Sequence, residues 1–202
     1  MSSGLNDPFA IRLACEEDAE SVLEIYGPIC ESSPISFETQ SPTLLDIPGR
    51  IRRTLTVLPW LVIEHSGKVL GYAYAGRHRD RAAYRWSVDV TVYVHQRARQ
   101  KQIGTALYLT LLHLLGIQGF YRAYAGITLP NVASIRLHER MGFQPVGVYH
   151  GVGHKLGAWH DVQWMEATLH NGNATPSDPI AISQIPPEYW KDAISKGQAV
   201  FA

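Results

Sequence analysis

Hydrophobic and polar positions follow two periods in the first part of the chain, and each period predicts one kind of element. Residues 10–14 alternate as in a short strand, whereas apolar positions after Glu17 recur at helical spacing. A second helix is expected to begin near Pro48, which suits a first helical turn, and to end before Pro59. Residues 60–75 are rich in β-branched side chains around a Ser-Gly turn and therefore predict a β-hairpin.

The second part of the chain twice follows a strand with a helix. Valines occupy every second position of residues 87–94, which predicts a strand with one buried face. A long helix is expected from Ile103 until glycines stop it, and the order repeats with a strand at 123–127 and a helix at 134–141. Two further strands are expected at residues 146–152 and 162–169. Strands mixed with helices in this order imply an α+β fold with a central mixed sheet.

One domain accounts for most of the chain, because 202 residues suffice for one well-buried core and are few for two. We place this domain at residues 10–170. From Asn171 the composition shifts to Asn, Gly, Ser, Pro and Thr, so residues 171–202 are expected to form a largely irregular C-terminal extension. Residues 187–190 can begin a short docking helix, and the alternative is a mobile tail with at most one helical turn.

Composition narrows the classes of partner. Eighteen basic residues balance eighteen acidic ones, so no net field attracts nucleic acid or an anionic membrane. Cys15 and Cys30 are too few for a disulfide framework or a thiolate metal site. The N-terminus lacks the apolar stretch of a signal peptide, and no run approaches the roughly 18 apolar residues that cross a bilayer. We expect a soluble, cytoplasmic protein without a metal, a membrane or a nucleic-acid partner.

The most informative segment runs from Val92 to Leu107 and combines a strand, a short basic loop and the start of a helix. A helix N-terminus presents unpaired N–H groups and partial positive charge, so it can hold a pyrophosphate. Arg99 and Lys101 add positive charge there. From these residues alone, a solvated basic loop before an ordinary helix remains the alternative.

Several motifs in the same order resemble the GNAT N-acetyltransferase superfamily. Residues 99–104 resemble its acetyl-CoA motif, Gln/Arg-x-x-Gly-x-Gly/Ala, with glutamine at position 102 where glycine is usual. Residues 129–143 resemble the second half of that family's site. Residues 157–162 and 59–62 are similar to one subgroup, the phosphinothricin and methionine sulfoximine acetyltransferases. The similarity covers about residues 11–169.

The resemblance implies a fold, a reaction and a partner. The fold would be the GNAT fold, a central mixed, mostly antiparallel, twisted sheet flanked by helices. The reaction would move an acetyl group from acetyl-CoA, the co-substrate, to the amino group of a small amino-acid-like molecule, by direct attack with general-base assistance. Members of this subgroup are commonly homodimers, so a homodimer is expected.

The resemblance also assigns residues to acetyl-CoA. The main chain of Val92 and Val94 would pair with the pantetheine arm as an added strand does. The N–H groups of residues 99–105 would hold the pyrophosphate, and Asn131 and Ser134 would add side-chain hydrogen bonds. From the residues alone, Asn131 is a common turn residue and Ser134 a common helix cap. The expected cofactor-binding residues are Val92, Tyr93, Val94, Arg99, Gln100, Lys101, Gln102, Ile103, Gly104, Thr105, Asn131 and Ser134.

Gln102 departs from the family motif. Glycine at such a position frees the local dihedral angles and lets the backbone approach phosphate closely. We expect glutamine to offer its N–H nevertheless, provided that its backbone is right-handed helical and its side chain points away.

Three groups receive catalytic roles from the resemblance. Asp89 lies where this subgroup typically has a glutamate proposed as general base; being one methylene shorter, it acts through a water or orients the ammonium group. The alternative is an exposed carboxylate or a partner for Arg85. His138 lies where many relatives have a tyrosine, and the subgroup a histidine, that protonates the departing thiolate; the alternative is a packed residue. The Val92 N–H is the expected oxyanion donor.

Arginines crowd the loop before Asp89 and suggest an acceptor that carries a carboxylate. At least two of the four, Arg77, Arg79, Arg81 and Arg85, are expected to be solvated instead. The expected substrate-binding residues are Phe37, Arg77, Arg81, Asp89 and Tyr93. Two other functions remain open: acetylation of another amine, including a protein N-terminus, and a CoA-binding regulatory module without catalysis.

Overall fold

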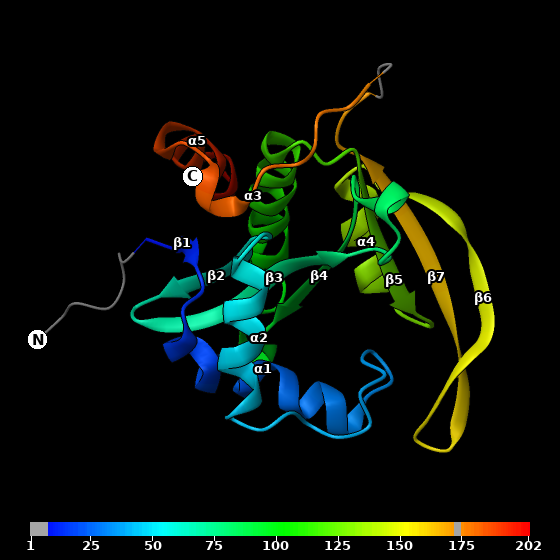
Figure 1. Cartoon of the computed structure of the whole chain (residues 1–202). Coiled ribbons are helices and arrows are strands. Elements are labelled where there is room, and N and C mark those ends of the chain that lie inside the picture. The colour runs from blue at the N-terminus through cyan, green and yellow to red at the C-terminus, as the bar shows by residue number, and fades with distance from the viewer. Residues whose placement is uncertain (1–7, 172–174) are drawn as a thin grey trace, which may run out of the picture.

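The computed structural model describes residues 8–171 and 175–202. Its centre is a seven-stranded sheet in the order β1-β2-β3-β4-β5-β7-β6 (Figure 1). Neighbouring strands are antiparallel except β4 and β5, which are parallel. The strands are β1 (Ala10–Leu13), β2 (Trp60–His65), β3 (Lys68–Arg77), β4 (Ser87–Val94), β5 (Arg122–Thr128), β6 (Gln144–Lys155) and β7 (Ala158–Thr168). The predicted α+β fold with a mixed, mostly antiparallel sheet is confirmed.

Helices cover both faces of this sheet. They are α1 (Ala19–Ser32), α2 (Asp46–Leu55), α3 (Ile103–Gln118), α4 (Val132–Arg140) and α5 (Pro187–Gln198). On one face, α1 and α2 enclose aromatic side chains of β2 and β3 such as Trp60 and Tyr72. On the other, α3 packs on valines and alanines of β3, β4 and β5. None of these described helices is long and apolar enough to cross a membrane.

Strand alternation assigns residues of β4 to the two faces. Val88 and Val90 belong to the core under α3, whereas Tyr93 packs with the core under α1 and α2. Because side chains alternate along a strand, Asp89 and Thr91 share the face of Tyr93. The sequence-based expectation that Asp89 faces away from its valine neighbours is therefore confirmed.

The C-terminal extension is folded where the structure describes it. Ile182, Ile185 and Ala193 are buried in the core under α3, and α5 lies beside α3 in Figure 1. Gly197 lets the two helices approach, because a Cβ there would collide with the Thr110 hydroxyl and the Ala106 carbonyl oxygen. The short helix expected near residues 187–190 is thus a docked helix, and the expectation of a largely irregular or mobile tail is wrong.

Replacing Gly197 with alanine is expected to lower the free energy of unfolding by about 1–3 kcal/mol, because the new methyl group overpacks the α3–α5 contact. Gly116→Ala is the matched control: it also lies inside a helix, but its nearest contact to an added Cβ is His170 at 4.0 Å. Urea denaturation followed by circular dichroism measures both. Equal stability of the two variants would contradict the close docking of α5.

Candidate active site

The site begins where β4 leaves β5. In the described part of the chain, these parallel strands pair only over the first residues of β4, and the last pair joins Asp89 to Tyr124. Both strands continue past that pair, β4 to Val94 and β5 to Thr128. The sheet therefore opens into a V, which has Asp89 and Tyr124 at its closed end.

Main-chain groups of β4 face into this V. The His95 N–H donates to the Leu70 carbonyl oxygen of β3 at 2.9 Å. Successive residues of an antiparallel strand direct their main-chain groups to opposite sides. By that alternation, Val94 and Val92 turn their N–H and C=O groups away from β3 and toward the opening. An extended molecule that carries amides, such as a pantetheine arm, fits these donors and acceptors.

The helix α3 presents free N–H groups at its start. Its first hydrogen bond runs from the Ala106 N–H to the Gln102 carbonyl oxygen at 3.0 Å. The N–H groups of residues 103–105 therefore have no partner within the helix and can hold a phosphate. The N–H of Arg99, which was expected to help hold the pyrophosphate, is not available, because it already donates to the Gln96 carbonyl oxygen at 3.4 Å. The run of amides available to a pyrophosphate thus begins after residue 99.

Two glutamines give the loop before α3 a left-handed backbone. The φ angle is 65° at Gln100 and 58° at Gln102. The expected right-handed conformation of Gln102 is therefore wrong, and the position has the geometry in which glycine is favoured. Gly104 serves packing instead: a Cβ there would lie 3.1 Å from the Leu137 side chain of α4. Both motif positions thus have separate physical reasons to favour glycine.

The residues that start α4 are used within the helix. The Asn131 Oδ1 accepts the Ser134 N–H at 3.2 Å, so Asn131 is the helix cap, and the expected alternative of Ser134 as the cap is wrong. The Asn131 Nδ2 remains a donor that this cap does not use. The Ser134 hydroxyl lies 3.4 Å from His138 Nδ1.

His138 is enclosed between α3 and α4 and is only 3 % exposed. Its Nδ1 lies 2.8 Å from the Ser134 carbonyl oxygen, and its Nε2 lies 3.0 Å from the Tyr108 hydroxyl. A carbonyl only accepts, so Nδ1 carries the proton and Nε2 accepts from Tyr108. Burial lowers the pKa of His138. With both nitrogens engaged, this arrangement fits the packed-residue alternative and does not fit direct proton transfer to a departing thiolate.

At the closed end of the V, Asp89 pairs with a histidine that the sequence analysis did not single out. The Asp89 Oδ1 lies 2.6 Å from Nδ1 of His78, the residue that follows β3. Burial raises the pKa of Asp89, although the hydrogen bond from His78 opposes that shift. The expected alternative partner, Arg85, lies elsewhere and pairs with Asp178 at 2.9 Å. The pairing of β3 with β4 could have identified His78. Gly76 lies opposite Asp89, so His78, two residues further along, is its diagonal neighbour on the same face.

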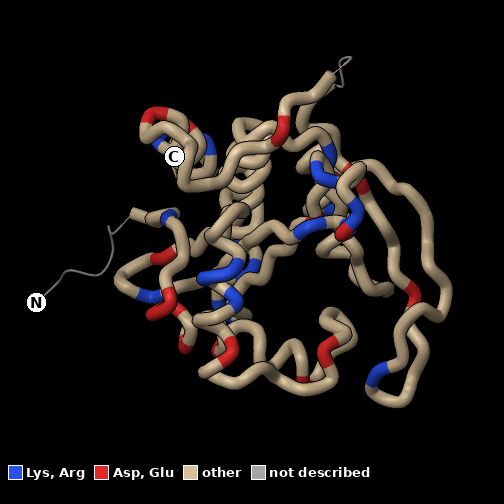
Figure 2. The backbone as a smooth tube through the Cα atoms, viewed as in Figure 1, with Lys and Arg blue, Asp and Glu red and all other residues tan. Residues whose placement is uncertain are grey.

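The arginines of the β3–β4 connection do not converge on Asp89. Figure 2 shows basic positions gathered at this connection, with acidic positions beside them. Arg77, Arg81 and Arg85 line a cavity of about 250 Å³ together with Val88, on the opposite face of the sheet from Asp89. Arg79 also reaches this cavity, and its charge favours the ionised form of Asp89. The structure therefore separates Arg77 and Arg81 from Asp89, the other polar member of the predicted substrate-binding set.

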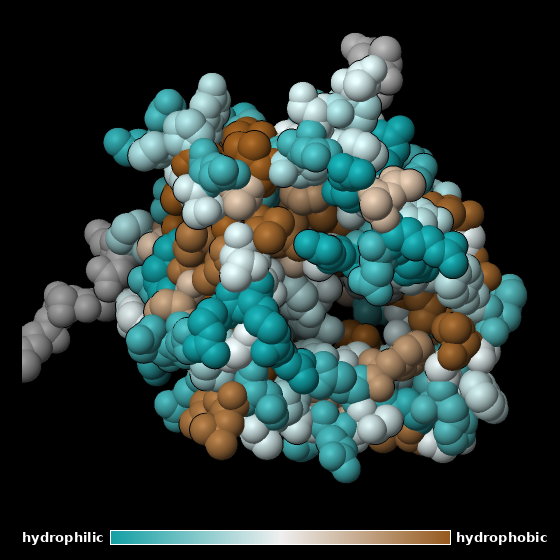
Figure 3. All heavy atoms as spheres, in the orientation of Figure 1, coloured by the Kyte–Doolittle hydropathy of each residue, from teal (hydrophilic) through white to brown (hydrophobic). Residues whose placement is uncertain are grey.

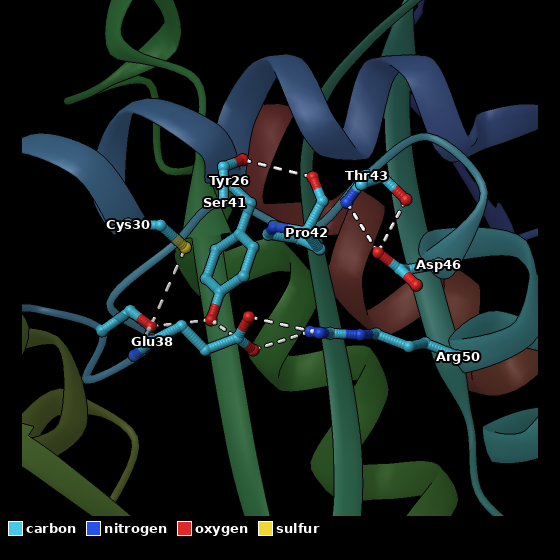
Figure 4. A network of polar contacts seen from close by, with 9 residues as sticks. Tyr26, Cys30, Glu38, Ser41, Pro42, Thr43, Asp46 and Arg50 are labelled. Atoms are coloured by element: carbon cyan, nitrogen blue, oxygen red, sulfur yellow. Dashed lines mark hydrogen bonds and ion pairs between the residues drawn. The ribbon is translucent and has the colours of Figure 1, made fainter.

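The connection between α1 and α2 closes the other side of the site. Lys155 of β6 donates to the Ser36 carbonyl oxygen at 2.6 Å, and the Phe37 ring fills the space above Gly153. Figure 4 shows the opposite anchor, where Tyr26 and Arg50 hold Glu38; the Arg50–Glu38 distance is 2.6 Å. This connection therefore spans from α1 to the β6–β7 hairpin.

The space-filling view shows the molecule hollowed between this connection, the β6–β7 hairpin and the sheet (Figure 3). Tyr93, predicted to line the acceptor pocket, packs against Tyr26 and Tyr72 at ring-centroid distances of 5.1 and 5.5 Å. Its ring therefore forms part of the aromatic floor on the Asp89 face. Phe37, which is 40 % exposed, lies at the rim by the hairpin.

The split sheet beside an unpaired helix N-terminus can hold an extended ligand that carries amides and phosphates. The chain belongs to the GNAT acetyltransferase family, because the family model described as "Acetyltransferase (GNAT) domain" matches residues 11–164. It is an acetyltransferase domain whose co-substrate is acetyl-CoA.

Named relatives and a solved structure agree with this family. The chain is 40 % identical over 155 residues to phosphinothricin N-acetyltransferase of Streptomyces viridochromogenes, which covers 77 % of this chain and 85 % of that protein. It is 33 % identical over 160 residues to the L-methionine sulfoximine/L-methionine sulfone acetyltransferase of Salmonella typhimurium, covering 79 % and 94 %. A phosphinothricin acetyltransferase from Sinorhizobium meliloti, solved with acetyl-CoA, superimposes with a TM-score of 0.81 at 31 % identity and covers 85 % and 95 %.

Replacing Gln102 with glycine is expected to raise the free energy of unfolding by about 1 kcal/mol, because glycine adopts the left-handed conformation without the cost that a side chain brings. Lys101→Gly is the matched control, because Lys101 is adjacent to Gln102 but does not have a positive φ. This variant should lower the free energy of unfolding by about 0.5–1 kcal/mol. Denaturation of the unliganded protein measures both. A loss of stability in both variants would contradict the left-handed assignment.

Proposed function

We propose that this protein acetylates the primary amine of a small amino-acid-like acceptor of the phosphinothricin or methionine sulfoximine type. The observation that carries the proposal is the position of Asp89 at the closed end of the V, on the face that is hollowed. A thioester that lies along Val92 and Val94 would end near this carboxylate. The activities for which the relatives at 33–40 % identity are named support the acceptor class.

The chemistry follows from groups of this chain. A protonated amine must lose a proton before it attacks, and Asp89 is the carboxylate placed to draw that proton off, directly or through an intermediary group. The Val92 N–H, which turns into the V, would stabilise the oxyanion on the thioester carbonyl. Free N–H groups at the start of α3 would hold the pyrophosphate. These roles use main-chain and side-chain groups and assign none to a metal.

The acceptor's carboxylate needs a cation on the Asp89 face. Arg79 also reaches the cavity on the opposite face, but it directly follows His78, the partner of Asp89, and its charge lowers the pKa of that carboxyl; we therefore propose Arg79 for this role in place of Arg77. Arg81, at the start of the 3₁₀ turn η2 (Ala82–Tyr84), lines the same cavity as Arg77 and is left out of the proposed acceptor site for the same reason. The connection around Phe37 is held at both ends, by Lys155 and by Arg50, and a connection so anchored beside the hollow favours a small acceptor over an extended peptide such as a protein N-terminus.

We also propose a homodimer formed through the β6–β7 hairpin, located in the cytoplasm. Large apolar side chains are exposed along this hairpin, among them Tyr149 at 50 %, Leu156 at 59 % and Trp159 at 69 %. An edge strand with such side chains is a natural pairing surface.

The free thiols of Cys15 and Cys30 suit a reducing compartment, which supports the proposed location in the cytoplasm.

The proposed activity is tested by thiol release from acetyl-CoA with phosphinothricin, methionine sulfoximine, methionine sulfone, ordinary amino acids and a short peptide. Turnover is expected with the sulfoximine or phosphinothricin. In Asp89→Ala, kcat should fall by about 100-fold or more, because proton removal from the amine loses its carboxylate.

Asp192→Ala is the matched control, since this aspartate lies on α5 and pairs with His113 away from the V. It should retain the wild-type rate. Binding of acetyl-CoA without turnover on any acceptor would overturn the proposed acceptor class and favour a regulatory CoA-binding module.

A further inference from the structure

The imidazole of His78 occupies the closed end of the V with its orientation fixed. Its plane stacks on Tyr124 at a centroid distance of 4.3 Å and an interplanar angle of 20°. Tyr84 and Trp164 present their edges at 5.9 and 6.1 Å. Tyr124 is also the cross-strand partner of Asp89 in the last β4–β5 pair. The ring therefore stands where the two strands part.

The two ring nitrogens of His78 have different surroundings. Nδ1 is bonded to Asp89 Oδ1 at 2.6 Å, and an ionised carboxylate only accepts, so Nδ1 carries the shared proton. Nε2 then keeps its lone pair. Within residues 8–171 and 175–202, no hydrogen bond to Nε2 is formed, and Nε2 is absent from the buried polar atoms that lack a partner. Nε2 is therefore a free acceptor that keeps some contact with solvent.

We propose that His78 is the general base of the acetyl transfer and that Asp89 is the positioning residue that fixes its tautomer. This inference rests on the proposed function and names the group that contacts the acceptor amine. Aspartate is one methylene shorter than glutamate, and the imidazole bonded to it supplies a second basic group beside Tyr124 at the closed end of the V. The side chain of His78 is 13 % exposed and that of Asp89 is 35 % exposed, so the pair is largely shielded but still in contact with solvent.

Among the described histidines, two others offer useful contrasts. His138 has both nitrogens engaged and is buried under α3, so it presents no lone pair to an amine. His113 also contacts an aspartate, Asp192, at 2.8 Å, but that pair joins α3 to α5 on the opposite side of the sheet. Only the His78–Asp89 pair combines a fixed tautomer with a place at the opening of β4 and β5.

The acceptor nitrogen loses two protons during the proposed transfer. The acceptor's ammonium group gives one proton to Nε2 of His78, which releases it to solvent. The amine nitrogen attacks the thioester carbon, an N–C bond forms and the carbonyl π pair moves to oxygen. When that pair returns, the C–S bond breaks, and the CoA thiolate takes the second proton from the nitrogen. The products are the N-acetyl compound, free CoA thiol and one proton.

The test compares His78→Gln, His78→Ala and Asp89→Asn, alone and combined, in the acceptor-dependent thiol-release assay with the full chain. Each single variant is expected to lose about 100-fold or more in kcat, while the KM for acetyl-CoA stays within a few-fold. The His78→Gln, Asp89→Asn double variant should be no slower than either single variant, because the two residues act as one unit. His113→Gln is the matched control and should keep the wild-type rate.

Added imidazole separates a chemical role from a structural one. It should raise the rate of His78→Ala in proportion to its concentration and leave His113→Gln unchanged. A His78→Gln variant with wild-type kcat, or a His78→Ala variant that folds and binds acetyl-CoA but gains nothing from imidazole, would overturn the inference. Silence of the wild-type protein toward every acceptor is a different result, because it contradicts the proposed function itself.

Discussion

The parting of β4 from β5 after the Asp89–Tyr124 pair is the constraint on which the candidate active site depends. Had the parallel pairing continued, the main-chain groups of Val92 and Val94 would be satisfied within the sheet. The parting leaves them for a ligand at the same end of the sheet where α3 begins with unpaired N–H groups. The proposed binding of the cofactor and the proposed position of the acceptor thus both depend on one interruption of the ladder.

The two faces of the sheet have different roles: one forms the main core and the other carries the candidate active site. The face under α3 contains the larger aliphatic core, and His138 and Tyr108 are sealed beside it. The face under α1 and α2 is aromatic, hollowed and bordered by polar side chains such as Asp89 and His78. Since strand residues alternate between faces, a shift of one residue in β3 or β4 would exchange these roles. Register is therefore as important to the site as the identity of its residues.

The sequence predicted the elements and the family well, because hydrophobic periods and glycine-containing motifs are local signals. It could not identify His78, whose contact with Asp89 requires the pairing of two strands across an arginine-rich loop. Asp178, the partner of Arg85, lies 93 residues further along the chain, so the sequence could not predict this pair either. The backbone conformation of Gln102 was predicted wrongly for a different reason. Its left-handed φ angle is set by the turn that the loop makes before α3 and not by the type of residue.

The C-terminal helix α5 belongs to the same folding unit as the family domain. The family match ends at residue 164, yet Ile182, Ile185 and Ala193 lie in the same apolar core as α3. Gln198 reaches across to the Phe9 carbonyl oxygen at 2.9 Å, and Phe9 stacks on Phe201. The segment beyond the family boundary has thereby become part of the folding unit. A boundary drawn from sequence similarity would cut through the hydrophobic interior, so homology and autonomy of folding do not coincide in this chain.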